Sequence, residues 1–329
     1  MRTITPRDTP AAGRPRDAAT LIREAEDLID RLRSSLPTKS IEDESTELVP
    51  LASAGPVKQI HGAAAVLAGS VLFDSAMEHY RGSFENKAMY APLAASALNL
   101  AASAHGMRET RTDSHVARTV TYAFSIGVGA LGFGFHAWNV GKRVGGFRWE
   151  NLFYGAPLGA PGALALSGLA GLAADRLAGN HRKTGTPTLM GLPAGRVVAG
   201  FTSLGLLGTV GEAGLLHFRG NFQNPAMYLP VTLPPLAAAV MAEAALVPSN
   251  RSRGTAKVWL GLTSALGFAG VAFHCYGVSR ALGGWRNWRQ NVLDGPPIPA
   301  PPSFSGLAVA GRAALALIEG ASGAGKDKT

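Results

Sequence analysis

Long apolar blocks separated by short polar stretches run through this chain from residue 59 onward. Each block is about 15–22 residues long, which is enough to cross the roughly 30 Å hydrocarbon core of a bilayer as an α-helix. The pattern therefore predicts an all-α, polytopic transmembrane helical bundle. The blocks lie at 59–79, 90–106, 119–140, 157–174, 197–217, 228–247, 257–278 and 303–320.

Two of these blocks, 157–174 and 303–320, fit the pattern least well. Each follows a stretch rich in Pro and Gly, and Arg312 interrupts the second block. A charged residue at the centre of a span costs roughly 2.5–3.5 kcal/mol. The two blocks are therefore either spanning helices or interfacial and re-entrant segments. We expect about eight spans, with six as the alternative.

The chain repeats itself at a spacing of 138 residues. Residues 79–92 match 217–230, and residues 135–136 match 273–274 at the same spacing. After an insertion of two residues the match continues, with Asn151, Gly155, Pro157 and Pro161 facing Asn291, Gly295, Pro297 and Pro301. An even number of spans in each copy returns the chain to the same side of the membrane, so the sequence predicts two parallel four-helix repeats. We assign them to 59–178 and 196–320.

The ends of the chain are polar. Residues 1–58 lack the apolar run of a secretory signal, and apolar residues recur at helical spacing over 17–35. We expect an amphipathic helix in this N-terminal segment, and a short tail at 321–329. Lys and Arg are more numerous on the side of the N-terminus, which predicts an inner-membrane protein with both termini in the cytoplasm.

Composition excludes several classes of protein. Of the 329 residues, 47% are hydrophobic and only 16% are charged, which is low for a soluble protein. The net charge of +9 does not indicate nucleic-acid binding, because the basic residues lie mostly at the ends of the apolar blocks. Cys275 is the one cysteine, so no disulfide forms within the chain. No catalytic motif is recognisable, which favours a non-catalytic subunit over an autonomous enzyme.

Four histidines occupy matching positions near the ends of apolar blocks, namely His79, His136, His217 and His274. A b-type haem needs two axial imidazoles at the same depth on facing helices, and these histidines meet that condition. Arg81 and Arg219, together with Lys142 and Arg280, lie just beyond them, where haem propionates would need cations. Glycines on 119–140 and 257–278 leave room either for a flat macrocycle or for a closely packed helix.

This plan is similar to that of multi-helix b-haem membrane subunits that anchor peripheral dehydrogenases. The resemblance rests on the four histidines and on hydropathy. It implies haem b as cofactor, with electrons relayed between a periplasmic or peripheral dehydrogenase and quinone. Pairing of His79 with His217 across the repeats stays open, as does an additional haem on the inner side between His61 and His105. The alternative is that the histidines bind loops by hydrogen bonds and hold no metal.

Two of the acidic residues inside apolar blocks lie at matching positions. Asp74 and Glu212 precede the repeated histidines, and buried carboxylates in a membrane mark proton or ion pathways. They predict a proton path, and with it a proton-coupled transporter or channel as the alternative function. A hydrogen bond to a small polar residue such as Ser96 or Thr263 would also account for them. A haem-free anchor or scaffold for a partner protein is the remaining alternative.

Overall fold

The computed structural model describes residues 27, 54–109, 115–179, 186–247 and 253–323. The chain divides into two units, 1–50 and 51–329, and the helices below all belong to the second. Of the amphipathic helix predicted at 17–35, only Asp27 is described, in helical conformation. The rest of that helix and residues 324–329 of the predicted tail lie outside the described residues.

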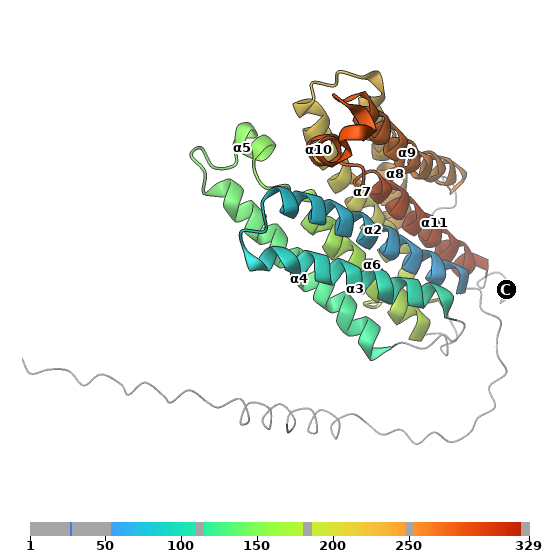
Figure 1. Cartoon of the computed structure of the whole chain (residues 1–329). Helices are drawn as coiled ribbons and strands as arrows, with labels where there is room; N and C mark the ends of the chain where they lie inside the picture. Colours follow the sequence, from blue (N-terminus) through green and yellow to red (C-terminus); the bar gives the residue numbers. More distant parts are fainter. Residues whose placement is uncertain (1–26, 28–53, 110–114, 180–185, 248–252, 324–329) are drawn as a thin grey trace, which may run out of the picture. The chain divides into compact units, whose positions relative to one another are not determined.

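The described part of the second unit is an all-α bundle, which confirms the predicted class (Figure 1). Its strands are one short antiparallel pair, in which Thr188 is opposite Pro193. The elements are α2 (Ala54–Arg81), η1 (Lys87–Tyr90), α3 (Ala91–Arg108), α4 (Val116–Gly141), α5 (Trp149–Tyr154), α6 (Gly159–Gly179), β1 (Thr188–Leu189), β2 (Leu192–Pro193), α7 (Ala194–Arg219), η2 (Pro225–Tyr228), α8 (Leu229–Leu246), α9 (Arg253–Arg280), η3 (Gly284–Asn287), α10 (Trp288–Asp294) and α11 (Pro302–Gly323).

The order of elements recurs along the chain. Helices α2 and α7 end 138 residues apart, and η1 with α3 corresponds residue for residue to η2 with α8 at that spacing. The short helices α5 and α10 each precede a long helix, α6 or α11, and they lie at the same end of the bundle (Figure 1).

Six of the described helices are long and apolar enough to cross a membrane, and α3 and α6 are not among them. Helix α11, which contains the doubtful block 303–320, is among the six and is the most buried of them. Helix α11 packs against α2, α7 and α9, and α6 packs against α2 and α4. Small residues dominate both helices because their neighbours are protein. The abundance of small residues therefore reflects helix contacts within the bundle.

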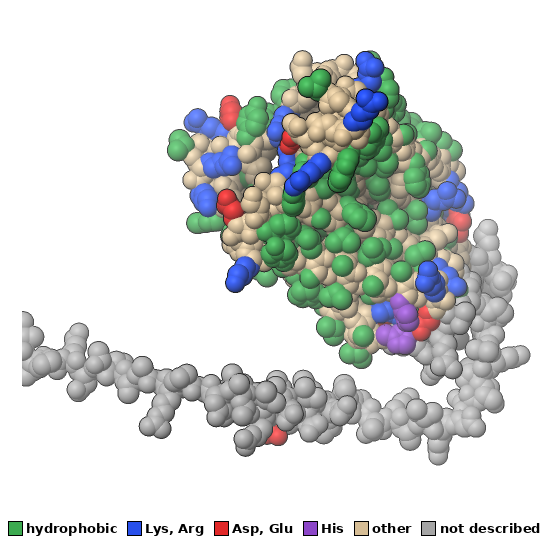
Figure 2. Space-filling view, in the orientation of Figure 1, with side chains coloured by type: hydrophobic (Ala, Val, Ile, Leu, Met, Phe, Trp, Pro, Cys, Tyr) green, Lys and Arg blue, Asp and Glu red, His purple; other side chains and the backbone are tan. Residues whose placement is uncertain are grey.

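Large apolar side chains are exposed along the outward faces of the long helices, including Phe73, Leu131, Leu204 and Phe268. Figure 2 shows apolar side chains covering the flank of the bundle, with Lys and Arg gathered towards its ends. An exposed apolar band of this kind is stable only against another apolar phase, and lipid provides one. The protein is thus a multi-pass helical bundle suited to contact with a lipid bilayer.

Candidate functional site

The four repeated histidines all contact backbone carbonyl groups. At the end of α2, His79 Nδ1 lies 2.7 Å from the carbonyl oxygen of Met89, and at the end of α7, His217 Nδ1 lies 2.8 Å from that of Met227. A carbonyl can only accept, so Nδ1 carries the proton and donates in both cases. Each histidine therefore closes the turn that leads into the next helix.

Other repeated residues build this turn. Ser83 and Phe84 adopt positive φ, the Asn86 side chain accepts a hydrogen bond from the Ala88 amide, and Phe84 stacks on Tyr90 with ring centres 4.4 Å apart. The second repeat has the same contacts, made by Asn221, Phe222, Asn224, Ala226 and Tyr228. The duplicated sequence between the first two helices of each copy is thus explained by one turn geometry.

His136 and His274 bind carbonyl groups elsewhere, where helical hydrogen bonding is interrupted. His136 Nδ1 lies 2.5 Å from the carbonyl oxygen of Pro157, and His274 Nδ1 lies 2.7 Å from that of Pro297. Both prolines belong to the non-helical stretches just before α6 and α11. Carbonyl groups freed from helical bonding at membrane depth need a donor from the protein. The two histidines supply that donor.

The histidines form one pair in each repeat. His79 and His136 are close enough to interact electrostatically, and the same holds for His217 and His274. Because Nδ1 is hydrogen-bonded to a carbonyl, Nε2 is the nitrogen available to an axial ligand position. Histidines that bind a metal through one ring nitrogen usually donate a hydrogen bond from the other to a carbonyl or carboxylate. Of the pairings left open by the sequence, these electrostatic interactions favour those within a repeat.

The cations predicted to bind propionates have contacts within the protein. Arg81 Nη1 lies 2.7 Å from a carboxylate oxygen of Glu78, and the guanidinium carbon of Arg219 lies 5.3 Å from the centre of the Tyr154 ring. The side chains of Lys142 and Arg280 are exposed.

The glycines on α4 and α9 pack against neighbouring helices. A Cβ atom on Gly129 would lie 2.5 Å from the amide nitrogen of Ala165 in α6, and one on Gly267 would lie 2.9 Å from the carbonyl oxygen of Pro301 beside α11. Of the two uses that the sequence allowed, these two glycines serve close helix packing. A macrocycle between α4 and α6, or between α9 and α11, does not fit this arrangement.

Asp74 and Glu212 come from matching helices, α2 and α7, and are close enough to interact electrostatically. Each lies about 10 Å below the end of its helix, counted at 1.5 Å per residue. The amide of Gly159, the first residue of α6, donates to the Glu212 carboxylate. Among the described residues neither acid forms an ion pair. Ser96, a suggested partner, donates instead to Pro92 in its own helix.

A cluster of charged and polar side chains lies within the first repeat, at the end of the bundle opposite the repeated histidines. We refer to it as the polar cluster. Its members are His61, Asn99, Ser103, His105, Glu109, His115, Arg118, Tyr122 and Asp175.

Arg118 holds the charged half of the polar cluster together. Its Nε lies 2.8 Å from the Asp175 carboxylate, and its Nη1 donates to Glu109 and lies 3.3 Å from His105 Nδ1. The side chains of Arg118 and Asp175 are 5% and 0% exposed. Such deep burial makes each charge depend on the other, because an unpaired charge in this position would be very costly.

Glu109 also contacts His115, whose Nε2 lies 2.7 Å from the carboxylate. It follows α3 and lies outside the apolar helices. Burial by itself would raise the pKa of Glu109, but the hydrogen bonds from Arg118 and His115 outweigh it and lower that pKa below its usual value. The ionised carboxylate is therefore the form that the fold stabilises.

The neutral half of the polar cluster is a chain of hydrogen bonds. His61 Nδ1 lies 3.1 Å from the Tyr122 hydroxyl, and Ser103 contacts both Tyr122 and the Asn99 carbonyl oxygen. Asn99 is fully buried, and its side-chain amide nitrogen has no partner among the described residues. The His61 ring packs on Gly106, where a Cβ would lie 2.6 Å from Nε2. A haem between His61 and His105 does not fit this arrangement.

The second repeat has apolar residues at six of the matching positions, whereas His105 and His115 match Glu243 and Arg253. The apolar residues are Ala199, Ala237, Met241, Ala256, Leu260 and Leu315, all buried, in place of His61, Asn99, Ser103, Arg118, Tyr122 and Asp175. The two sites have the same backbone packing, because Gly171 lies against Tyr122 as Gly311 lies against Leu260. The polar cluster is thus a feature of one repeat, placed on a framework common to both.

Most of this cluster is not predicted from the sequence. The second repeat has Ala199 and Glu243 where the first has His61 and His105, and the contacts of these histidines make that difference informative. The usable signal was the set of buried positions at which one copy is polar and the other apolar.

Comparisons with protein families, with characterised proteins and with solved structures find no match to this chain.

Proposed function

We propose that this chain is an inner-membrane protein with eight transmembrane helices in two parallel repeats and with both termini in the cytoplasm. Six helices have the length and composition of spans. The other two, α3 and α6, correspond in order to α8 and α11, which are among those six. The excess of Lys and Arg on the side of the N-terminus supports the orientation.

Within this architecture we propose proton-coupled transport, with Asp74 and Glu212 as the proton-carrying groups. One observation supports it above the others: matching carboxylates of the two repeats lie inside the apolar helices, close enough to interact electrostatically and without an ion-pair partner among the described residues. Acidic residues in such positions are characteristic of proton relays, and coupling sites of repeat-built transporters lie between the repeats. The α6 N-terminus beside Glu212 resembles the broken helices of such sites.

The polar cluster provides groups for proton exchange on the opposite side of the membrane. His61 and Asp74 lie on the same helix, about 20 Å apart along its axis. In our proposal a proton bound at the Asp74 and Glu212 carboxyls passes to the side of the polar cluster when the bundle changes conformation. His61 and Tyr122 then accept and release it.

The first test uses dicyclohexylcarbodiimide, which adds to protonated carboxyl groups in apolar surroundings to form an N-acylurea. We expect adducts on Asp74 or Glu212 in the purified protein, found by peptide mass spectrometry and increasing as the pH is lowered. Asp74→Asn removes one adduct site and Glu212→Gln the other. Absence of adducts at both carboxyls at every pH tested would contradict the proposal.

The second test measures proton movement in proteoliposomes that contain a pH-sensitive dye. An imposed membrane potential, or a solute from a screened set, is expected to acidify the vesicle interior. The double variant Asp74→Asn, Glu212→Gln is expected to abolish this signal, while Glu78→Gln, at the exposed end of α2, keeps it. Equal signals from both variants would rule out these carboxyls as carriers.

Electron transfer is the second candidate function. A b-type cytochrome-like subunit would bind haem b through His79, His136, His217 and His274, and would relay electrons between a periplasmic or peripheral dehydrogenase and quinone. What favours it is the pairing of histidines within each repeat, with Nε2 available on each ring.

A dithionite-reduced minus oxidised spectrum with a pyridine haemochrome assay tests this candidate. Sharp b-type bands that disappear in His79→Ala would support it. A colourless protein from haem-replete cells would eliminate it. If carbodiimide labelling and proton flux also fail, a haem-free anchor for a partner protein becomes the better proposal.

A further inference from the structure

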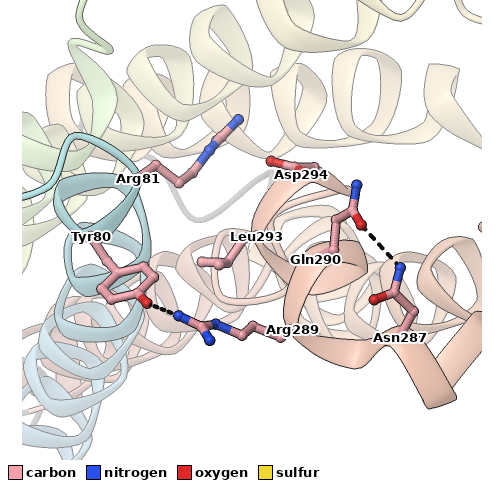
Figure 3. Close-up of a pocket in the computed structure, with 7 residues that line it drawn as sticks. All are labelled: Tyr80, Arg81, Asn287, Arg289, Gln290, Leu293 and Asp294. Atoms are coloured by element: carbon pink, nitrogen blue, oxygen red, sulfur yellow. Dashed lines mark hydrogen bonds between the residues drawn. The ribbon is translucent and has the colours of Figure 1, made fainter.

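A polar pocket lies between the end of α2 in the first repeat and α10 in the second (Figure 3). Its volume is about 520 Å³. Tyr80 and Arg81 line it from α2, and Arg289, Gln290 and Asp294 line it from α10. Nothing in the proposed transport function uses these residues, so the pocket requires its own explanation.

The pocket lies at the level of lipid headgroups. Helix α2 has 28 residues and is about 42 Å long, close to the thickness of a bilayer with its headgroup layers. Arg81 is its last residue, so it lies at the membrane surface. Trp285 and Trp288 are exposed next to the pocket, as expected of an aromatic belt at the membrane–water interface.

The lining has the donors that a phosphate group needs. Arg289 donates to the Tyr80 hydroxyl, with its guanidinium carbon 5.9 Å from the ring centre, so its position is fixed on one wall. Arg81 extends into the pocket from another wall (Figure 3), and its ion pair with Glu78, at 2.7 Å, uses one of its five N–H donors. Guanidinium groups bind phosphate by paired, charge-assisted hydrogen bonds. Gln290 accepts from Asn287 through its side-chain oxygen, at 3.1 Å, which leaves its amide nitrogen as a further donor.

Asp294 adds an acceptor. Figure 3 shows its carboxylate facing the side of the pocket to which Arg81 extends, and the two do not form an ion pair. With two cations and one anion in the lining, a ligand with a phosphate and a cationic group complements the pocket better than a simple anion does. A primary amine provides such a group and hydrogen-bonds well to a carboxylate.

The equivalent site, between the end of α7 and α5, is filled by aromatic side chains. There α5 meets the end of α7, and Trp149, Phe153 and Phe218 stack in sequence with ring centres 5.3 and 5.4 Å apart. Arg219 lies over Tyr154. Asn151 and Asn291 bind the preceding loops in the same way, which sets the correspondence of the two short helices. Where the first repeat has Trp149, Phe153 and Tyr154, the second has Arg289, Leu293 and Asp294.

We propose that this pocket binds the headgroup of a phospholipid that carries both a phosphate and a primary amine. Arg81 and Arg289 hold the phosphate, and Asp294 holds the amine. The opposite side of the bundle, closed by stacked aromatic rings, does not bind it. Soluble phosphoethanolamine has the same chemistry as the lipid headgroup, so the test includes both sources.

The experiment is native mass spectrometry of the whole protein in mild detergent, titrated separately with phosphatidylethanolamine, phosphatidylglycerol and free phosphoethanolamine. We expect the first lipid to bind best. Arg289→Gln should weaken that binding about tenfold, as loss of one charge-assisted contact predicts. Arg219→Gln, which removes a cation on the closed side at the position that matches Arg81, should leave binding as in the original protein. Asp294→Asn should remove the preference over phosphatidylglycerol.

The outcomes separate cleanly. The proposal would be overturned if the two lipids bound equally well to the original protein. It would also be overturned if Arg289→Gln and Arg219→Gln weakened lipid binding to the same extent. Stronger binding of free phosphoethanolamine than of the lipid would also overturn it, since the pocket would then serve a soluble ligand. If Arg289→Gln unfolds, the filled variant Leu293→Phe, Asp294→Tyr tests the same point, and binding that survives this change refutes the pocket as the site.

Discussion

The polar cluster of the first repeat and the matching site of the second differ in chemistry but share a framework. Tyr122 and Leu260 occupy the same place, each against a glycine of the neighbouring helix, Gly171 or Gly311. One site holds buried charges and hydroxyls, and the other holds methyl groups. Because the apolar version packs just as tightly, the helical framework does not require the polar one.

This difference bears on function. A buried ion pair such as that of Arg118 with Asp175 is a weak source of stability, since desolvation of both charges offsets their attraction. Apolar residues of similar volume often stabilise a fold equally well. Retention of six polar and charged side chains at positions where the second repeat has apolar ones therefore favours a role beyond folding, and proton exchange is the role that we propose.

The largest effect is expected from removing Asp175 and leaving its ion-pair partner Arg118 in place. Asp175→Leu introduces the residue found at the matching position, Leu315, but leaves Arg118 charged and buried. We expect a loss of about 3 kcal/mol in the free energy of unfolding, because the buried guanidinium loses one of its two carboxylate partners and keeps only Glu109. Titration with SDS in mixed micelles measures it.

The matched double variant sharpens the comparison. Arg118→Ala with Asp175→Leu copies Ala256 and Leu315 of the second repeat, so no unpaired charge remains between α4 and α6. We expect it to recover most of the stability lost in Asp175→Leu, and to lose proton flux. A double variant as unstable as the single one would mean that the framework of the first repeat does depend on the ion pair.

Helix positions were predictable from sequence, and the contacts between helices were not. The block 90–106 became Ala91–Arg108 because an apolar run of that length has few alternatives in a membrane. The short elements η1, α5 and β1 were missed, since their few residues carry no periodic signal.

For the candidate site, the repeated histidines were found but their partners were not. The carbonyl of Pro157 receives a hydrogen bond from His136, 21 residues away, through a break in helical bonding that only the folded chain reveals. Arg118 and Asp175 are 57 residues apart, on helices whose facing sides the sequence does not specify. Polar residues at the ends of apolar blocks look the same whether they face lipid headgroups or one another.

A smaller effect is expected at His136 and His274, where the two repeats form the same hydrogen bond to a proline carbonyl. His136→Ala and His274→Ala each leave a proline carbonyl at the start of α6 or α11 without its donor. An unsatisfied buried acceptor costs about 1–3 kcal/mol. We expect similar losses from both variants in the SDS titration, and less than about 0.5 kcal/mol from the exposed control Thr121→Val. A large loss in one repeat alone would indicate that its histidine does more than satisfy a carbonyl.

The smallest effect concerns pH and belongs to the first repeat only, since Val247 stands at the position that matches Glu109. Hydrogen bonds from Arg118 and His115 overcome the effect of burial and lower the pKa of Glu109 in the folded state. The contribution of Glu109 to the free energy of unfolding is therefore complete above its pKa in the unfolded chain, about 4.3. This contribution disappears as the pH falls through the pKa of Glu109 in the folded state. We expect Glu109→Gln to flatten the acid side of the stability curve, measured as unfolding midpoint against pH. A variant curve parallel to the original would mean that other carboxyls set the acid limit.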